Sequence, residues 1–271
     1  MKLKPMALFS LAALTVVGSI SVAHADQLDD IKSAGKITVA VFDSNPPFGF
    51  IEPKSKQLAG YDIDFANALA KKLGVKLELK STNPANRIPL LVSGKVDAVV
   101  AAFTITEERA KQVDFTVPYF VTGQQFLVPK GKFQKADDLA KAKIGAVKGT
   151  TGEQEIHKSY PQAKVLSYDE IAVAFAAQRN GNVQVITQDG AILAGLLAAA
   201  PDRAKYEIPS YKVSTEPYGI AVKKGETALL QAINSALVEF EKDGQAEGIY
   251  NSWFGPNSST PLPRDFKIEQ K

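Results

Sequence analysis

Arg109 occupies a position that does not favour a purely structural arginine. It falls in the first turn of a short helix that Thr106 caps and that continues with Glu107 and Glu108. The partial positive charge of a helix N-terminus disfavours a cation there by about 0.3–1 kcal/mol. A surface pair with Glu108 or Asp114 is one interpretation. The other is ligand binding, because a guanidinium holds a carboxylate through two parallel hydrogen bonds, which lysine cannot supply.

Asp189 is a second candidate. It follows an apolar stretch at 183–187 that is typical of a buried strand. Ligands of open α/β sheets bind at the carboxyl ends of strands, which is where this carboxylate would lie. An aspartate before Gly190 is also a common helix cap, and the residue alone favours that simpler interpretation.

The segment Gly-Thr-Thr-Gly at 149–152 follows a strand pattern and opens a helix pattern. Backbone N–H groups and a threonine hydroxyl at such a helix start can point at one anion. Thr151 is the candidate ligand residue, although plain helix capping by Thr150 or Thr151 explains the segment equally well. Lys148 precedes the turn, and its sequence position leaves open whether it faces a ligand or solvent.

Composition excludes several kinds of chemistry. The 271-residue chain has no cysteine and only two histidines, His24 and His157. Thiol nucleophiles, disulfides and cysteine-based metal sites are therefore excluded. No Walker loop, nucleophile elbow or H-E-x-x-H segment occurs. The formal charge of +3 is spread without a Lys/Arg cluster, so nothing indicates nucleic-acid binding. We expect no catalytic residues, cofactor or metal.

Residues 1–25 are typical of a cleaved export signal. Lys2 and Lys4 precede an apolar stretch at 6–22, and Ala-His-Ala at 23–25 gives the small-x-small pattern of a cleavage site. A membrane anchor is the alternative, but the stretch is short and interrupted by polar residues. We expect cleavage after Ala25 and an exported chain that is not inserted in the membrane.

The rest of the chain alternates strand and helix patterns, which predicts an α/β protein. Strands are expected at 37–41, 77–79, 96–102, 125–129, 143–147, 164–167, 183–187 and 218–222. Helices are expected at 62–73, 88–92, from 106, 135–141, 151–159, 168–179, 189–199, through 229–240 and at 249–254, with an extended tail at 255–271. Two such series predict two lobes, linked near 118 and 214–217, with a cleft between them for a small ligand.

Several motifs carry a resemblance to a known family. In chain order they are PPFGF at 46–50, GYDID at 60–64, AFTITEERAKQVDF at 102–115, PY at 118–119, GTTG at 149–152, EPYGIAV at 216–222 and WFG at 253–255. Together with the export signal they resemble the amino-acid-binding family (family 3) of bacterial periplasmic solute-binding proteins, the receptors of ABC importers. The resemblance spans about 35 to 255.

The resemblance implies a two-lobed type II periplasmic-binding-protein fold with two mixed, mostly parallel sheets and two crossing hinge segments. Lobe 1 would comprise 26–118 plus 219–271, and lobe 2 would comprise 119–218. It implies a monomer in the periplasm that passes an amino acid to a membrane permease. Arg109 would bind the α-carboxylate with Thr104 and a backbone group of Ala102. Asp189 would bind the α-ammonium, and Thr151 would contribute from the second lobe.

The expected specificity is for glutamate or aspartate, with glutamine or asparagine next. Many relatives clamp the ligand between two aromatic residues, but Asn45 and Pro84 stand at those positions here. Phe42 stands where binders of cationic amino acids often carry an acid. Arg87 resembles an arginine with which acidic-amino-acid binders hold a side-chain carboxylate, although it could also be a solvated residue at a helix start.

Two other functions are compatible with this family. One is a periplasmic dehydratase acting on prephenate or arogenate, which needs a positioned general acid such as Glu153 or Glu170. The other is a ligand-sensing module for a membrane receptor, which would use the same binding site with a different partner.

Overall fold

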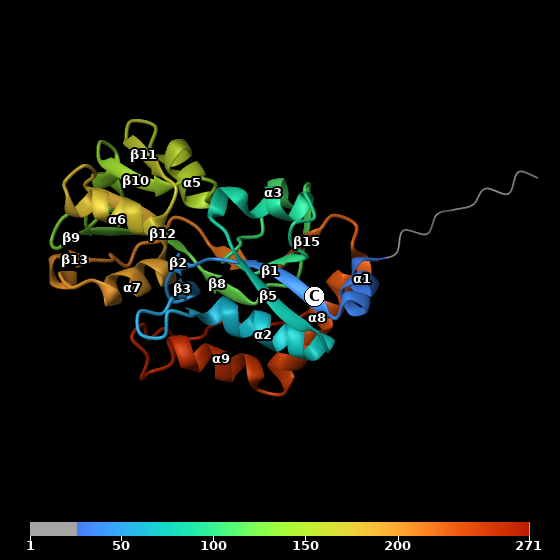
Figure 1. The fold of residues 1–271 in the computed structure, drawn as a ribbon. Helices are drawn as coiled ribbons and strands as arrows, with labels where there is room; N and C mark the ends of the chain where they lie inside the picture. Colours follow the sequence, from blue (N-terminus) through green and yellow to red (C-terminus); the bar gives the residue numbers. More distant parts are fainter. Residues whose placement is uncertain (1–25, 271) are drawn as a thin grey trace, which may run out of the picture.

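The computed structural model describes residues 26–270, so the predicted export signal lies outside the described part. Two five-stranded sheets form the frame of the two lobes (Figure 1). The first has the order β5-β1-β6-β15-β7, with β1 (Lys36–Val41), β5 (Lys76–Ser81), β6 (Ala98–Val99), β7 (Val113–Phe115) and β15 (Ala221–Lys223). The second has the order β11-β10-β12-β9-β13, with β9 (Gln124–Pro129), β10 (Lys143–Val147), β11 (Lys164–Tyr168), β12 (Val185–Asp189) and β13 (Tyr206–Glu207).

The sheets are mixed, as predicted, but only half of the strand pairs are parallel. In the first sheet β1 runs parallel to β5 and β6, whereas β15 is antiparallel to β6 and β7. In the second, β10 is parallel to β11 and β12, whereas β9 is antiparallel to β12 and β13. The antiparallel strands β9 and β15 are those that follow the two connections between the lobes, so they enter their sheets without a βαβ crossover.

Helices cover both sheets. The first lobe carries α1 (Gln27–Ala34), α2 (Tyr61–Leu73), α3 (Arg87–Val92), α4 (Glu107–Ala110), α8 (Thr227–Lys242) and α9 (Gln245–Phe254). The second carries α5 (Thr151–Ser159), α6 (Ile171–Arg179) and α7 (Gly190–Ala199), on the left in Figure 1. A small sheet, β2 (Ser44–Asn45), β3 (Gly49–Ile51) and β4 (Leu58–Ala59), and three 3-10 turns, η1 (Pro84–Asn86), η2 (Ala136–Leu139) and η3 (Arg203–Lys205), complete the elements. The helix expected at 135–141 is therefore only a single 3-10 turn.

Two connecting strands join the lobes. β8 (Phe120–Thr122) and β14 (Glu216–Tyr218) pair antiparallel and lie where the sequence predicts the crossings. The exact lobe boundaries at 118/119 and 218/219 stay a prediction. In the described part of the chain, no helix has the length and apolar character needed to cross a membrane.

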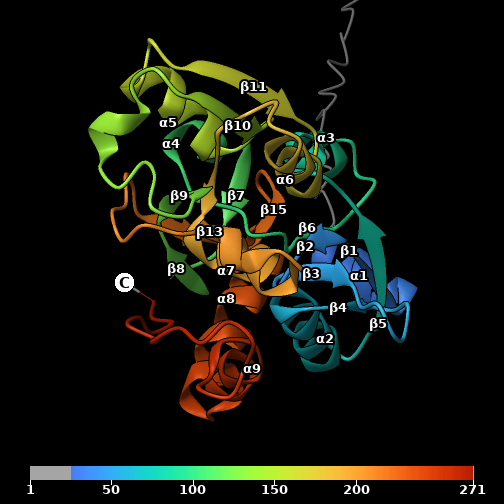
Figure 2. The ribbon, with the colours of Figure 1, turned by 90° about the vertical axis from the view of Figure 1, so that its left-hand side faces the viewer.

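The C-terminal segment differs from the expected extended tail. Residues 255–270 form no helix or strand, yet Ile268 is 1 % exposed and Phe266 packs on Phe120 of β8 with ring centroids 5.4 Å apart. Arg264 forms a largely buried ion pair with Glu241 of α8, and Figure 2 shows the end of the chain beside α9. The segment is therefore part of the packed structure, because its apolar side chains find partners far away in the sequence.

One large apolar core runs through both lobes. It includes β1, α2 and β15 of the first lobe, the ring of Phe120 in β8, and Phe175 and Leu193 of the second lobe. A smaller separate cluster covers the other face of the second sheet, with Phe126, Leu139, Ile144, Ile156 and Val185 among its members.

Candidate functional site

A buried pocket lies between the lobes where several chain segments meet. Its wall comprises the ends of β1 and β12, the η1–α3 turn, the segment from β6 to α4, and the start of α5. It contains six of the seven residues predicted from the sequence. The full lining is Phe42, Asn45, Pro84, Arg87, Ala102, Thr104, Arg109, Thr150, Thr151, Gln188, Asp189 and Ile192.

Arg109 points from α4 into this pocket and is 7 % exposed. Thr106 caps the helix by accepting a hydrogen bond from the Arg109 N–H, as predicted. Nη1 donates to the Thr104 carbonyl at 2.7 Å, and Nη2 donates to the carbonyl of Gly149 in the other lobe at 3.0 Å. No carboxylate of residues 26–270 forms an ion pair with Arg109, so the surface pairing with Glu108 or Asp114 does not occur. The Arg109 guanidinium is therefore a buried cation that has no carboxylate partner among the described residues.

Arg87 is 3 % exposed and lies at the same pocket. Four hydrogen bonds hold its guanidinium, and all end on backbone carbonyls: Pro84, Ala101 and Ala102 of its own lobe, and Gly149 across the cleft. The guanidinium carbon lies 4.1 Å from the centre of the Phe103 ring. A solvated arginine is therefore excluded, but most of its donors already have partners.

Asp189 is the last residue of β12 and directly precedes α7. It therefore occupies both positions that the sequence suggested, the carboxyl end of a strand and the cap of a helix. Its side chain makes no helix-capping hydrogen bond. One oxygen accepts a hydrogen bond from the Tyr218 hydroxyl, and the other, Oδ1, is buried without a hydrogen-bond partner among the described residues. Burial, together with repulsion from Glu216, raises the pKa of Asp189 to about 7. An ammonium group would satisfy this carboxylate and stabilise its charged form.

The start of α5 contributes polar groups from the second lobe. Thr150 caps the helix, and the Thr151 hydroxyl donates to Glu216 at 2.8 Å. Lys148 does not line the pocket. Its ammonium pairs with Asp169 at 2.9 Å, and both side chains are exposed. Of the two orientations that the sequence left open for Lys148, the structure shows the one toward solvent.

Ala102 presents its backbone to the pocket through an unusual conformation. Its φ is +40°, a left-handed value that a non-glycine residue adopts only when its surroundings enforce it. The N–H donates to the buried carboxylate of Asp62 at 2.9 Å, and the carbonyl accepts from Arg87 at 3.0 Å. The hydroxyl of Tyr119 also donates to Asp62, at 2.6 Å.

The sequence did not single out Asp62 as a functional residue. It reads as the acid in the first turn of α2, although it stands in the GYDID motif. Burial raises the pKa of Asp62 to about 7. The sequence did not indicate Gln188 and Ile192 either, although both line the pocket. Their proximity to Asp189 in the sequence was the available signal.

Direct contacts hold the lobes together beside the pocket. The Ser44 hydroxyl donates to Glu170 of the second lobe at 2.7 Å. At Gly195 of α7, an added Cβ would lie 2.3 Å from the carbonyl oxygen of Pro46. The backbones of the two lobes are thus as close as a glycine allows.

The comparisons with known proteins agree with this architecture. The model of bacterial extracellular solute-binding proteins, family 3, matches residues 37–256. The chain belongs to this family. It is 41 % identical over 233 residues to the ABC transporter glutamine-binding protein of Bacillus subtilis, covering 84 % of each chain. It is 33 % identical over 255 residues to the L-cystine-binding protein of Escherichia coli, covering 92 % of this chain and 95 % of the relative.

The same fold is found among solved structures of amino-acid-binding proteins. An ancestral arginine-binding protein bound to glutamine superimposes with a TM-score of 0.78 at 43 % sequence identity, covering 82 % of this chain and 98 % of the other. The two-lobed type II fold predicted from the motifs is confirmed, as is membership of the amino-acid-binding solute-binding proteins.

The pH dependence of binding provides a test of Asp189. A bound ammonium would stabilise its charged form, so affinity should level off near pH 8 and fall below pH 7, by up to about tenfold per pH unit, as the carboxylate takes up a proton. Calorimetry across this range measures the effect. The pKa of this carboxylate also depends on its charged and hydrogen-bonding neighbours, which are Glu216, Tyr218, Arg109 and Arg87. The variant Asp189→Asn removes the titrating group itself and leaves these neighbours in place. A decline that persists in Asp189→Asn would assign the pH dependence to another group, Asp62 foremost.

Proposed function

We propose that this chain is the periplasmic solute-binding component of an ABC importer for a polar amino acid, with glutamine as the first candidate. One observation carries the proposal: Arg109 and Asp189, from opposite lobes, line one buried pocket. A free amino acid carries a carboxylate and an ammonium, so its two ends match these two side chains. Because only the closed form offers both contacts, the ligand stabilises closure.

The charges around the pocket favour a ligand without net charge. Two buried cations, Arg87 and Arg109, face three buried carboxylates at or beside the pocket, namely Asp62, Asp189 and Glu216. There is thus no surplus of buried positive charge for the second carboxylate of glutamate or aspartate, whereas a zwitterion with a neutral side chain adds no net charge. Burying an unpaired charge is costly. This balance supports glutamine over the acidic ligands that Arg87 alone suggests.

The contacts of Arg87 support the same choice. A side-chain carboxylate would need two free donors of its guanidinium, but four hydrogen bonds already connect it to backbone carbonyls. An amide oxygen requires only one donor. The amides of Asn45 and Gln188, which also line the pocket, add further donors and acceptors for a polar side chain.

A panel titration with stripped protein tests the ligand. Protein unfolded and refolded without ligand is titrated by calorimetry with glutamine, glutamate, aspartate, asparagine, cystine and arginine. We expect one site per chain and the highest affinity for glutamine. A clear preference for glutamate or aspartate would restore the acidic assignment, and the absence of binding by every member would refute the importer function.

Arg87→Ala gives a second test of the side-chain contact. We expect it to weaken glutamine and glutamate to a similar extent, about 10- to 100-fold, which corresponds to a hydrogen bond from a charged donor. Isothermal titration of both ligands measures the ratio. Arg203→Ala, which removes an exposed arginine, is the matched control. A much larger loss for glutamate than for glutamine would show that Arg87 binds a side-chain carboxylate.

We further propose that the chain works by binding alone, as a monomer that a signal peptidase releases after Ala25 and that docks on a membrane permease. Neither Glu153 nor Glu170, the acids considered for a dehydratase, lines the pocket. Incubation with prephenate should yield no phenylpyruvate. Retrieval of a permease rather than a sensory receptor from membranes would distinguish the importer from a sensing module.

A further inference from the structure

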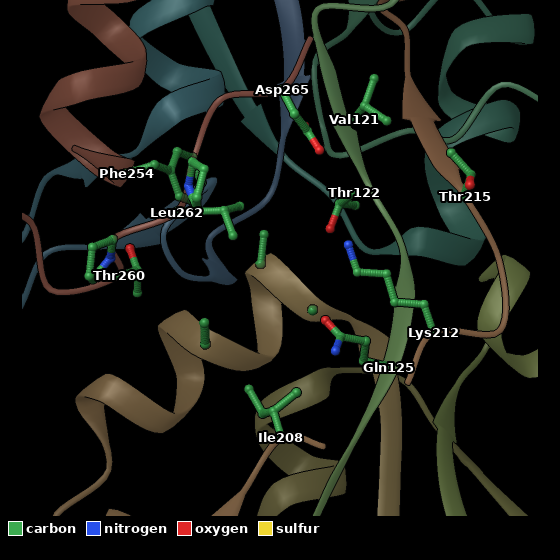
Figure 3. A pocket seen from close by; sticks show the side chains of 15 residues that line it. Val121, Thr122, Gln125, Ile208, Lys212, Thr215, Phe254, Thr260, Leu262 and Asp265 are labelled. Carbon is green, nitrogen blue, oxygen red and sulfur yellow. The ribbon is translucent and has the colours of Figure 1, made fainter. Parts of the chain in front are cut away.

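A second cavity of about 570 Å³ lies on another face of α7, and it has far more room than the amino-acid pocket. Figure 3 shows Lys212, Thr122 and Gln125 on one side of it, with Phe254 and Leu262 opposite. The full lining is Val121, Thr122, Gln125, Gly190, Ala191, Ala194, Ile208, Lys212, Thr215, Phe254, Thr260, Pro261, Leu262, Pro263 and Asp265. The volume lies within the range of about 300–1,000 Å³ that is typical of small-molecule sites.

Both lobes build this cavity. α7 and the segment from Ile208 to Lys212 belong to the second lobe, while α9 and residues 260–265 pack on the first. α7 is shared between the two pockets, since Ile192 lines the amino-acid pocket and Ala191 and Ala194 line the cavity. Any movement of α7 between open and closed forms must therefore change both.

The C-terminal wall of the cavity lies beyond the part that the family model matches, which ends at residue 256. It is nevertheless firmly held. The Thr260 hydroxyl donates to the Trp253 carbonyl at 2.8 Å, and the Tyr250 hydroxyl donates to the Leu262 carbonyl at 3.1 Å. Leu262 N–H donates to the Phe254 carbonyl at 2.9 Å. The wall is thus an ordered addition to the family fold.

The cavity combines apolar walls with one charge of each sign. Leu262, Ile208 and Val121 supply apolar surface, together with the prolines at 261 and 263, while Phe254 lies almost fully buried in the same wall. Lys212 extends its ammonium into the space, with its stem packed against Gly123. Within residues 26–270, neither Lys212 nor Asp265 forms an ion pair. An anion and a cation on one small molecule would match these two groups.

We propose that this cavity is a second ligand site, for a small zwitterion with a large apolar side chain such as a hydrophobic amino acid. Lys212 holds its carboxylate, Asp265 attracts its ammonium, and the apolar walls bury its side chain. The site is separate from import of a polar amino acid, because none of its lining residues belongs to the amino-acid pocket.

The two sites should influence each other. A molecule that binds the cavity more tightly in one arrangement of the lobes, open or closed, lowers the free energy of that arrangement. The affinity of the amino-acid pocket depends on the same equilibrium between the open and closed forms. Coupling of this kind is reciprocal, so each ligand must change the affinity of the other by the same factor.

L-phenylalanine is the probe for this proposal, measured by calorimetry on the full chain. We expect one phenylalanine per chain to bind in the presence of saturating glutamine. We also expect binding to persist in Arg109→Ala, which disables the first site. Lys212→Ala should weaken it at least tenfold, and Ala194→Phe, which fills the cavity, should abolish it. The two cavity variants should keep a glutamine site.

Matched controls are Lys158→Ala, an exposed lysine of α5, and Ala172→Phe, an exposed alanine of α6; neither should change phenylalanine binding. Mutually exclusive binding, in which the apparent dissociation constant of phenylalanine keeps rising in proportion to the glutamine concentration, would overturn the proposal by placing phenylalanine in the first pocket. Loss of phenylalanine binding in Arg109→Ala would overturn it on the same ground. Absence of phenylalanine binding at millimolar concentration would also overturn it. The Arg109→Ala measurement does not depend on glutamine, so failure of the glutamine assignment leaves this test intact.

Discussion

Arg109→Ala is expected to abolish binding of every amino acid, with a dissociation constant raised at least about 100-fold. The variant would remove the two-pronged, charge-assisted contact that we propose for the ligand carboxylate, and it would leave that carboxylate buried without a partner. Loss of one partner of a buried ion pair costs about 3–5 kcal/mol, and each 1.4 kcal/mol is about tenfold in affinity. Calorimetry measures the loss with whichever amino acid binds best to the wild type.

Arg109→Lys separates charge from geometry. Lysine keeps the positive charge but cannot form two parallel hydrogen bonds, so binding should be intermediate. Arg203→Ala, in an exposed turn, should bind as the wild type does. Thermal unfolding verifies that each variant is folded. If folded Arg109→Ala retained affinity within tenfold of the wild type, the carboxylate site would lie elsewhere.

Gly195→Ala is expected to weaken binding at least about tenfold without touching the ligand. The added Cβ would lie 2.3 Å from the Pro46 carbonyl oxygen and 2.7 Å from Cδ of Pro47, both in the opposite lobe. The first contact is with backbone, so the lobes must separate to accommodate it. Apparent affinity falls in proportion to the fraction of molecules able to close. Calorimetry gives the affinity, and solution X-ray scattering gives the degree of closure with ligand.

Gly248→Ala is the matched control, because its Cβ would meet nothing within 4 Å on α9. Alanine favours a helix by up to about 1 kcal/mol over glycine, so neither variant should unfold more easily in the absence of ligand. Weaker binding by Gly195→Ala with unchanged or greater stability would identify the lobe contact as the cause. Equal affinities of Gly195→Ala and Gly248→Ala would show that the closed form does not need this contact.

Much of the site could be predicted because its signals are local. Thr106 caps a helix that carries Arg109 three residues later, and Asp189 follows an apolar strand. Lys148 and Thr151 differ in a way that local sequence signals do not predict. Both stand at the same turn, but Lys148 pairs with Asp169, beside β11, and is therefore held at the surface. Nothing near Lys148 in the sequence indicates that partner.

The remaining features depend on contacts between residues far apart in the chain. Asp62 looks like a helix-start acid, and only the fold brings it to the Ala102 N–H, forty positions later. The C-terminal segment is polar and rich in proline, which is typical of an extended tail. Its order comes from Glu241 and Phe120, neither of which the local pattern reveals.

The apolar core that continues through β8 has a consequence for how the molecule unfolds. Because Phe120 packs against residues of the first lobe and the same cluster extends to Phe175 and Leu193, neither lobe can expose its interior without disturbing the other. The lobes should therefore melt in one cooperative transition. Amide hydrogens of β1 and β12 should accordingly exchange with solvent at similar, slow rates.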